Sequence, residues 1–159
     1  MTKIPAYKLF KLSNPIQCLA VGFGSGLVPK APGTFGTLAA IPLYLLLAQL
    51  SVTVYLIVTL VVCLAGIYIC GKAAEDVGVH DHPAIVWDEF AGFLITMAFV
   101  PLSVVNIVIG FALFRFFDIV KPWPIKWADQ KVHGGLGIML DDILAGLISL
   151  MCMMVYMQV

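Results

Sequence analysis

The stretch VTVYLIVTLVVCLAGIYIC, residues 52–70, contains no charged side chain. A helix that crosses the hydrocarbon core of a bilayer needs about 20 mostly apolar residues, so this stretch predicts a membrane-spanning helix. Four more apolar runs, bounded by turns or charges, predict further spans at residues 34–50, 85–100, 104–120 and 138–156. The expected fold class is therefore all-α: a polytopic helical membrane protein with about five spans.

The composition supports lipid as the solvent of this chain. Hydrophobic residues make up 62% of the 159 positions and charged residues only 11%, with a mean hydropathy of +1.04. So few charges cannot cover the surface of a soluble protein of this length, and the length favours one domain over residues 1–159. The formal net charge of zero argues against a nucleic-acid partner, which requires a basic face. The sequence carries no signal for an oligomeric state.

Two features qualify the number of spans. The run at residues 34–50 is short and contains Pro42, so it could instead be a re-entrant segment, which would leave four spans. Before it, Ser13-Asn14-Pro15 is typical of a helix start, with the cap supplied by Ser13 or Asn14. The segment that follows, residues 16–28, is too short to cross and is expected to lie at the membrane interface.

The charges predict the orientation. The links at residues 49–51 and 101–103 carry no charge, whereas the other connections hold every lysine in the chain. The positive-inside rule then places those lysine-bearing connections in the cytoplasm. With five spans, the C-terminus lies on the opposite side of the membrane.

The acidic residues gather at the predicted cytoplasmic ends of three spans. Ionisable groups at membrane depth cost several kcal/mol on most scales, so acids that converge at one depth indicate a shared site. Carboxylate oxygens suit a hard divalent cation, magnesium in particular. The alternative is that these acids only pair with nearby basic residues or cap helices. The candidate metal ligands are Asp88, Glu89, Asp118, Asp141 and Asp142.

Two glycine-rich segments could bind phosphate. The segment GFGSG at residues 22–26 includes Gly24 and Gly26, and it is equally compatible with close packing of small residues. The segment PKAPGTFGT at residues 29–37 favours an anion site at a helix N-terminus, formed by Gly33, Thr34 and Thr37. Neither segment is a Walker A loop or a dinucleotide-binding fingerprint, because the residues and the βαβ context are missing.

The remaining polar residues are less specific. His80 and His82 flank Asp81 in a polar loop, where solvated side chains are more common than metal ligands. His133 could donate a proton to a leaving group. Glu75 and Asp129 lie in polar connections, so neither is expected to matter for activity.

Several motifs together resemble one family, the phosphatidylglycerophosphatase A family of small bacterial membrane phosphatases. The resemblance extends over most of the chain and rests on separate motifs that occur in the right order. They are AVGFGSG at residues 20–26, APGT at 31–34, VHDH at 79–82, IVWDE at 85–89, Arg115 and Asp118 followed by KPWPI at 121–125, and HGG at 133–135 followed by DDILAG at 141–146.

The resemblance implies a magnesium-dependent hydrolase that converts phosphatidylglycerophosphate to phosphatidylglycerol at the bacterial inner membrane. The ion would be held by Asp88 or Glu89, by Asp118, and by Asp141 or Asp142, with water as the nucleophile. Asp88, Glu89, Arg115, Asp118 and His133 are the expected catalytic residues. Contacts to the substrate phosphate are expected from Gly24, Gly26, Gly33, Thr34, Thr37, Arg115 and Lys121.

Two other classes of membrane protein share some of these features. A CDP-alcohol phosphotransferase also combines carboxylates with a lipid phosphate, but its Asp-Gly-x-x-Ala-Arg element is missing from the sequence. An ion-binding transporter places its acids near the bilayer midplane, whereas these acids lie at one face. The expected partners are therefore a phospholipid substrate and the bilayer itself.

Overall fold

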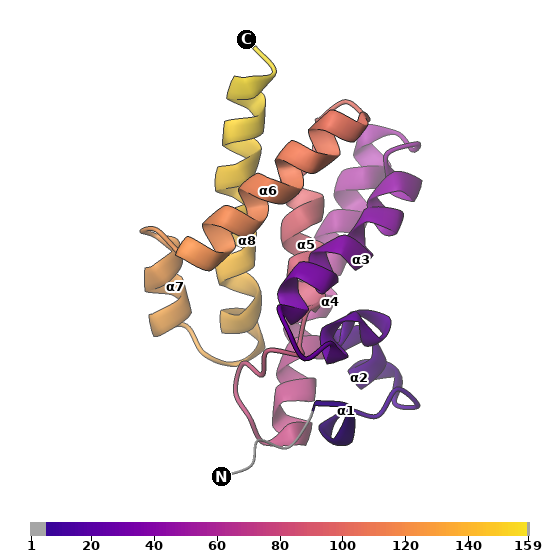
Figure 1. Cartoon of the computed structure of the whole chain (residues 1–159), viewed down its shortest axis with the longest axis vertical. Coiled ribbons are helices and arrows are strands. Elements are labelled where there is room, and N and C mark those ends of the chain that lie inside the picture. The colour runs from indigo at the N-terminus through magenta and orange to yellow at the C-terminus, as the bar shows by residue number, and fades with distance from the viewer. Residues whose placement is uncertain (1–5, 159) are drawn as a thin grey trace.

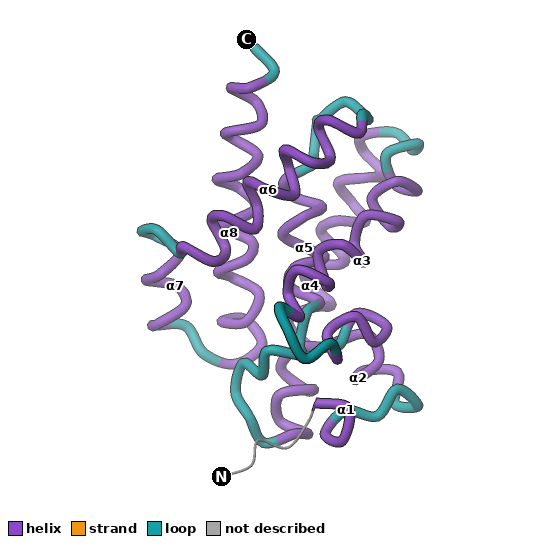
Figure 2. The backbone as a smooth tube through the Cα atoms, viewed as in Figure 1, coloured by secondary structure: helices purple, strands orange, loops and turns teal. Residues whose placement is uncertain are grey.

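Residues 6–158 are described by a computed structural model, and every regular element in that range is a helix (Figures 1 and 2). The expected all-α class is confirmed. In chain order the elements are α1 (Ala6–Leu9), α2 (Pro15–Ala20), the 3₁₀ helix η1 (Gly22–Leu27), α3 (Pro32–Leu47), α4 (Val52–Val77), α5 (Trp87–Thr96), α6 (Val104–Val120), α7 (Ile125–Lys131) and α8 (Gly134–Tyr156).

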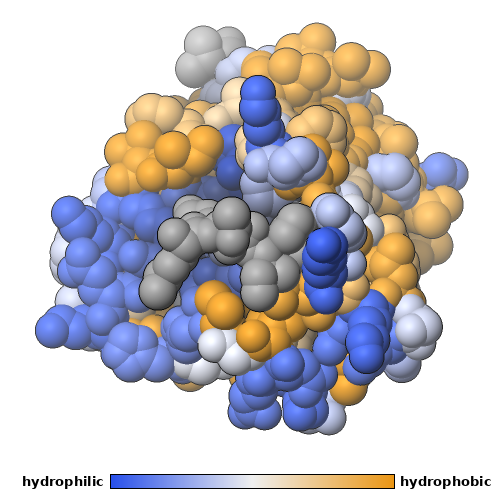
Figure 3. All heavy atoms as spheres, turned by 60° about the horizontal axis from the view of Figure 1, so that its bottom comes forward, coloured by the Kyte–Doolittle hydropathy of each residue, from blue (hydrophilic) through white to orange (hydrophobic). Residues whose placement is uncertain are grey.

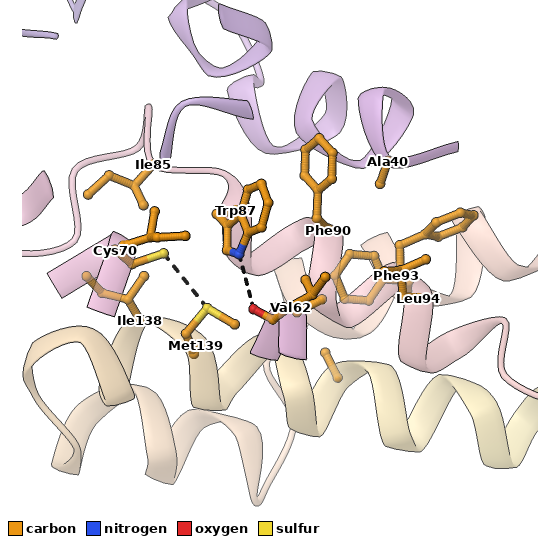
Figure 4. Close-up of a cluster of buried hydrophobic side chains, with 14 of the residues drawn as sticks. Ala40, Val62, Cys70, Ile85, Trp87, Phe90, Phe93, Leu94, Ile138 and Met139 are labelled. Carbon is orange, nitrogen blue, oxygen red and sulfur yellow. Dashed lines mark hydrogen bonds between the residues drawn. The ribbon is translucent and has the colours of Figure 1, made fainter. Parts of the chain in front are cut away.

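Helix α5 is the core of the bundle. It contacts α3, α4, α6 and α8, and all of its residues except Ile95 are buried. Figure 4 shows the indole Nε1 of Trp87 donating a hydrogen bond to the carbonyl oxygen of Val62 in α4, at 3.2 Å. The same indole stacks on the ring of Phe90, with 5.5 Å between centroids. The four longer helices, α3, α4, α6 and α8, therefore pack around the short helix α5.

The outer faces of the long helices are apolar. Helices α4 and α8 are long and apolar enough to cross a membrane, and α3 is apolar but shorter. On α4 the side chains of Leu60 and Leu64 are 58% and 59% exposed, and on α8 that of Met151 is 66% exposed. Contiguous apolar surface of this kind is unfavourable in water and favourable in lipid. The structure therefore supports association with a membrane.

The two ends of the bundle differ. The α3–α4 link, the α5–α6 link and the C-terminal end of α8 lie at one end, and α1, α2 and η1 lie at the other (Figure 1). Seen toward that second end, much of the surface is hydrophilic, with apolar side chains around it (Figure 3). Helix α2 begins there as expected, because the Asn14 side-chain oxygen accepts hydrogen bonds from the backbone N–H groups of Ile16 and Gln17.

Helices α5 and α8 touch through glycines. A Cβ added to Gly146 would lie 3.1 Å from the Cα of Gly92, and one added to Gly92 would lie 2.8 Å from the carbonyl oxygen of Asp142. Such distances leave no space for a side chain. Small residues of this kind let membrane helices approach backbone to backbone. The contact brings the start of α5 close to the acidic segment of α8.

Several observed bounds differ from the predicted spans. Helix α6 has the predicted bounds, but α5 ends at Thr96, because Phe99 adopts a left-handed conformation (φ 65°) just before Pro101. Helix α4 continues seven residues past the predicted end at 70, where Lys72 pairs with Asp76 along the helix surface. Helix α8 starts four residues early, at Gly134, and α3 continues through Pro42.

We expect Gly146→Val to destabilise the protein by about 1–3 kcal/mol, because the added side chain must push α8 away from α5. The measurement is the thermal unfolding temperature in detergent. Leu147→Val, one residue along and 45% exposed, is the matched control and should change that temperature little. An unfolding temperature for Gly146→Val equal to that of the control would contradict the close contact.

Candidate functional site

Two carboxylates begin the central helix. Asp88 and Glu89 occupy the first turn of α5, where the positive end of the helix dipole favours negative charge. The Glu89 backbone N–H donates a hydrogen bond to the Asp88 carboxylate at 3.1 Å. Both side chains are buried, with 8% of each residue exposed. The core helix therefore presents two acids inside the protein.

Helices α6 and α8 bring the other acids to the same place. Asp141 and Asp142 lie in the first half of α8, at 8% and 3% exposure, about one helical turn before Gly146, which contacts α5. Asp118 lies near the end of α6, three residues after Arg115, and the two side chains form an ion pair. Arg115 also lies 3.7 Å from the carboxylate of Glu89, so one guanidinium links α6 to α5.

The five acids form two overlapping groups of possible metal ligands. One group is Asp88, Glu89 and Asp142, and the other is Asp118, Asp141 and Asp142. Within each group the potential ligand oxygens lie within 4.8 Å of one another. The structure thus brings together every acid that the sequence suggested as a ligand, and Asp142 belongs to both groups.

The carboxylate oxygens in these two groups suit a hard divalent cation. Oxygens of Glu89, Asp141 and Asp142 are buried without a hydrogen-bond partner from the described residues. A buried carboxylate without a partner is costly, and several side by side also repel one another. Carboxylate oxygens are the ligands that magnesium takes from proteins. These residues could therefore hold such an ion.

The N-terminus of α3 abuts the same cluster. A Cβ added to Gly33 would lie 2.9 Å from both terminal nitrogens of Arg115 and would collide with the Glu89 carboxylate. Thr34, which follows, lies in the first turn, and its backbone N–H donates a hydrogen bond to the carbonyl oxygen of Ala31 at 3.0 Å. The Thr37 hydroxyl is buried and donates to the carbonyl oxygen of Gly33 at 2.9 Å, so its proton is already engaged.

The GFGSG segment takes part in packing. A Cβ added to Gly26 would collide with the carbonyl group of Ala84, and one added to Gly22 would lie 2.8 Å from the side chain of Val86. These contacts favour the packing alternative, in which η1 supports the loop that leads into α5. Gly24 has a left-handed backbone (φ 101°), and a Cβ there would meet only Leu12 at 3.9 Å or more.

Lys121 is placed differently from the expectation. Its Nζ lies 2.6 Å from a carboxylate oxygen of Asp141 and also pairs with Asp129 of α7. Burial by itself lowers the pKa of Lys121, but the two carboxylates outweigh it and hold that pKa above its ordinary value. The lysine is thus occupied in orienting Asp141. Asp129, which the sequence suggested to be dispensable, is connected to the cluster through it, and no local pattern in the sequence signals this link.

The histidines lie around the loop that precedes α5. His133 comes just before α8, eight residues from Asp141 and thus about 12 Å along the helix. Its ring packs against that of His80, whose Nε2 accepts a hydrogen bond from the backbone N–H of Gly134 at 2.9 Å. His82 accepts one from the Ala84 N–H, and burial lowers its pKa. These contacts hold the loop and give His133 no place among the grouped acids.

Comparison with known proteins identifies the relatives of this chain. The family model described as Phosphatidylglycerophosphatase A matches residues 18–157. The chain belongs to the phosphatidylglycerophosphatase A family. The Escherichia coli K12 protein named Phosphatidylglycerophosphatase A is 51% identical over 156 residues, covering 94% of this chain and 90% of that protein. A Haemophilus influenzae protein of the same name is 52% identical over 149 residues, covering 92% and 91%. No solved structure matches the chain.

We expect Asp129→Asn to weaken magnesium binding by about tenfold, because Lys121 then holds Asp141 less firmly and second-shell partners tune the affinity of a metal site. A magnesium titration of the thermal unfolding temperature in detergent measures this change. Glu75→Gln is the matched control, since Glu75 only approaches the exposed Lys72 at 3.8 Å. Equal magnesium affinities for the two variants would contradict the role of Asp129.

Proposed function

We propose that this protein is a magnesium-dependent lipid phosphatase that hydrolyses phosphatidylglycerophosphate to phosphatidylglycerol and inorganic phosphate. The observation that carries the proposal is the buried group of five carboxylates beside Arg115 and the N-terminus of α3. Membership of the phosphatidylglycerophosphatase A family supports the choice of substrate.

The phosphate would be bound between Arg115 and the first turn of α3. The Nε of Arg115 is buried without a hydrogen-bond partner, and guanidinium groups bind phosphate oxygens with charge-assisted hydrogen bonds. The first turn of α3 adds the positive end of a helix dipole. Because Gly33 has no side chain, the backbone of α3 can come this close to Arg115.

The carboxylates would hold the ion and handle the proton. When bound, magnesium neutralises phosphate charge and lowers the pKa of a coordinated water. Asp88, Glu89, Asp118, Asp141 and Asp142 are the residues that would hold it. The grouped side chains include no hydroxyl, thiol or imidazole, so we propose that water attacks the phosphorus directly while a carboxylate takes its proton. The phosphorus–oxygen bond to glycerol breaks, and the glycerol oxygen takes up a proton from solvent.

We further propose that the chain crosses the bacterial inner membrane five times, with the acids near the cytoplasmic face. The two hairpin links and the C-terminal end of α8 share one end of the bundle, as five alternating spans require (Figure 1). Residues 31–71, 90–114 and 143–159 contain no charge, which leaves every lysine for the other side. That side faces the cytoplasm in this proposal.

Purified protein in detergent should release inorganic phosphate from phosphatidylglycerophosphate when magnesium is present and should stop when the metal is chelated. Asp88→Asn, Asp118→Asn and Asp142→Asn should each lower kcat by at least about 100-fold, because each removes a negative ligand. Glu75→Gln is the control and should keep full turnover. Activity that survives exhaustive chelation would overturn the dependence on magnesium, and no release of phosphate under any condition would overturn the function.

Reporter fusions test the orientation. An alkaline phosphatase fused after Val159 should be active, because the proposed fifth span carries the C-terminus out of the cytoplasm. The same reporter fused in the polar loop after Gly78 should be inactive. The opposite pattern, confirmed by a reporter that works only in the cytoplasm, would contradict five spans.

A further inference from the structure

We propose that the site holds two divalent cations and that the carboxylate of Asp142 bridges them. This inference rests on the proposed function but goes beyond it, because it concerns the number of ions and the role of one residue. It starts from the two overlapping groups of acids. Asp88 and Glu89 of α5 share only Asp142 with Asp118 and Asp141.

The position of Asp142 suits a bridging ligand. At 3% exposure it is the most buried of the five acids, and one of its oxygens has no hydrogen-bond partner in the described part of the chain. Each of the other four belongs to one group alone. A carboxylate has two oxygens and can therefore bind one cation through each. Oxygens without a hydrogen-bond partner also occur on Glu89 of one group and on Asp141 of the other, so each group has a carboxylate oxygen that could bind a cation.

The charge balance distinguishes one ion from two. The five carboxylates, together with Asp129, which shares Lys121 with Asp141, are opposed at close range by two cationic side chains, those of Arg115 and Lys121. With every carboxylate ionised, these eight groups leave four negative charges. One divalent cation would still leave two negative charges, which would repel the nearly doubly charged phosphate monoester. A second cation neutralises the site and so removes that repulsion.

Arg115 spans the two groups. Its guanidinium pairs with Asp118 of one group and lies 3.7 Å from Glu89 of the other. A phosphate bound by this guanidinium would therefore lie against both groups at once. In enzymes that use two metal ions, the ions lie about 3.5–4 Å apart and act on the attacking and leaving oxygens of the same phosphate. Here each group of acids would hold one of the two ions, and Arg115 would hold the phosphate against both groups.

Manganese can report the number of ions directly, since it takes oxygen ligands and is paramagnetic. Purified protein in detergent is dialysed against Mn²⁺, the bound metal is counted per chain, and electron paramagnetic resonance shows whether the ions interact. We expect two ions per chain with a spin-coupled spectrum that added Mg²⁺ displaces. Asp142→Asn should abolish the coupled spectrum and weaken Mn²⁺ binding at least tenfold. Glu75→Gln should keep two coupled ions.

One ion per chain at saturation would overturn the proposal, as would two ions whose spectrum is uncoupled in the unaltered protein. Persistence of the coupled spectrum in Asp142→Asn would overturn the bridging role of that residue. If this variant does not fold, Asp88→Asn replaces it and should keep one uncoupled ion on the other group. The two proposals can fail separately. Phosphate release with a single bound ion rejects only the bridge, and two coupled ions without hydrolysis of any lipid phosphate reject only the function.

Discussion

Mutual repulsion among buried carboxylates is the constraint on which the rest of this structure depends. Five acids from three helices form two overlapping groups, in each of which the potential ligand oxygens lie within 4.8 Å of one another, and most of the acids are almost completely removed from solvent. Such a group is unstable unless positive charge compensates it. Arg115 supplies part of that charge from α6, and Lys121 supplies part from the turn that follows α6. In the function that we propose, divalent cations supply the remainder.

The sequence predicted which acidic residues form this site better than it predicted the contacts between the site residues. Apolar run lengths located the long helices, and the positions of the acids at helix ends indicated one shared site. The bounds of α5 and α8 were less predictable, because a left-handed residue such as Phe99 and an early start at Gly134 leave weak local signals. The partners of Lys121 could not be found from the sequence, and for Gly26 the sequence left packing and phosphate binding as equal alternatives. Both depend on contacts between segments distant in the chain, which no local pattern encodes.

The bundle inverts the usual distribution of polarity. Its outer faces are apolar while its most polar group lies in the interior, around the start of α5. Glycines make this arrangement possible, since the contact between Gly92 and Gly146 brings two acidic segments together and Gly33 admits a third backbone. Small residues here serve both the packing of helices and the chemistry of the site. The family match extends over residues 18–157 and includes all of these positions.

The shortness of α5 has a consequence for the contact between the site and the surrounding lipid. With ten residues the helix is about 15 Å long, roughly half the thickness of a bilayer's hydrocarbon core. Helices α3, α4, α6 and α8 enclose it, so these helices and not α5 face the acyl chains. A helix too short to span the hydrocarbon core is tolerated when protein covers it. The acids at its start are therefore shielded from the acyl chains by neighbouring helices, whatever the thickness of the host membrane.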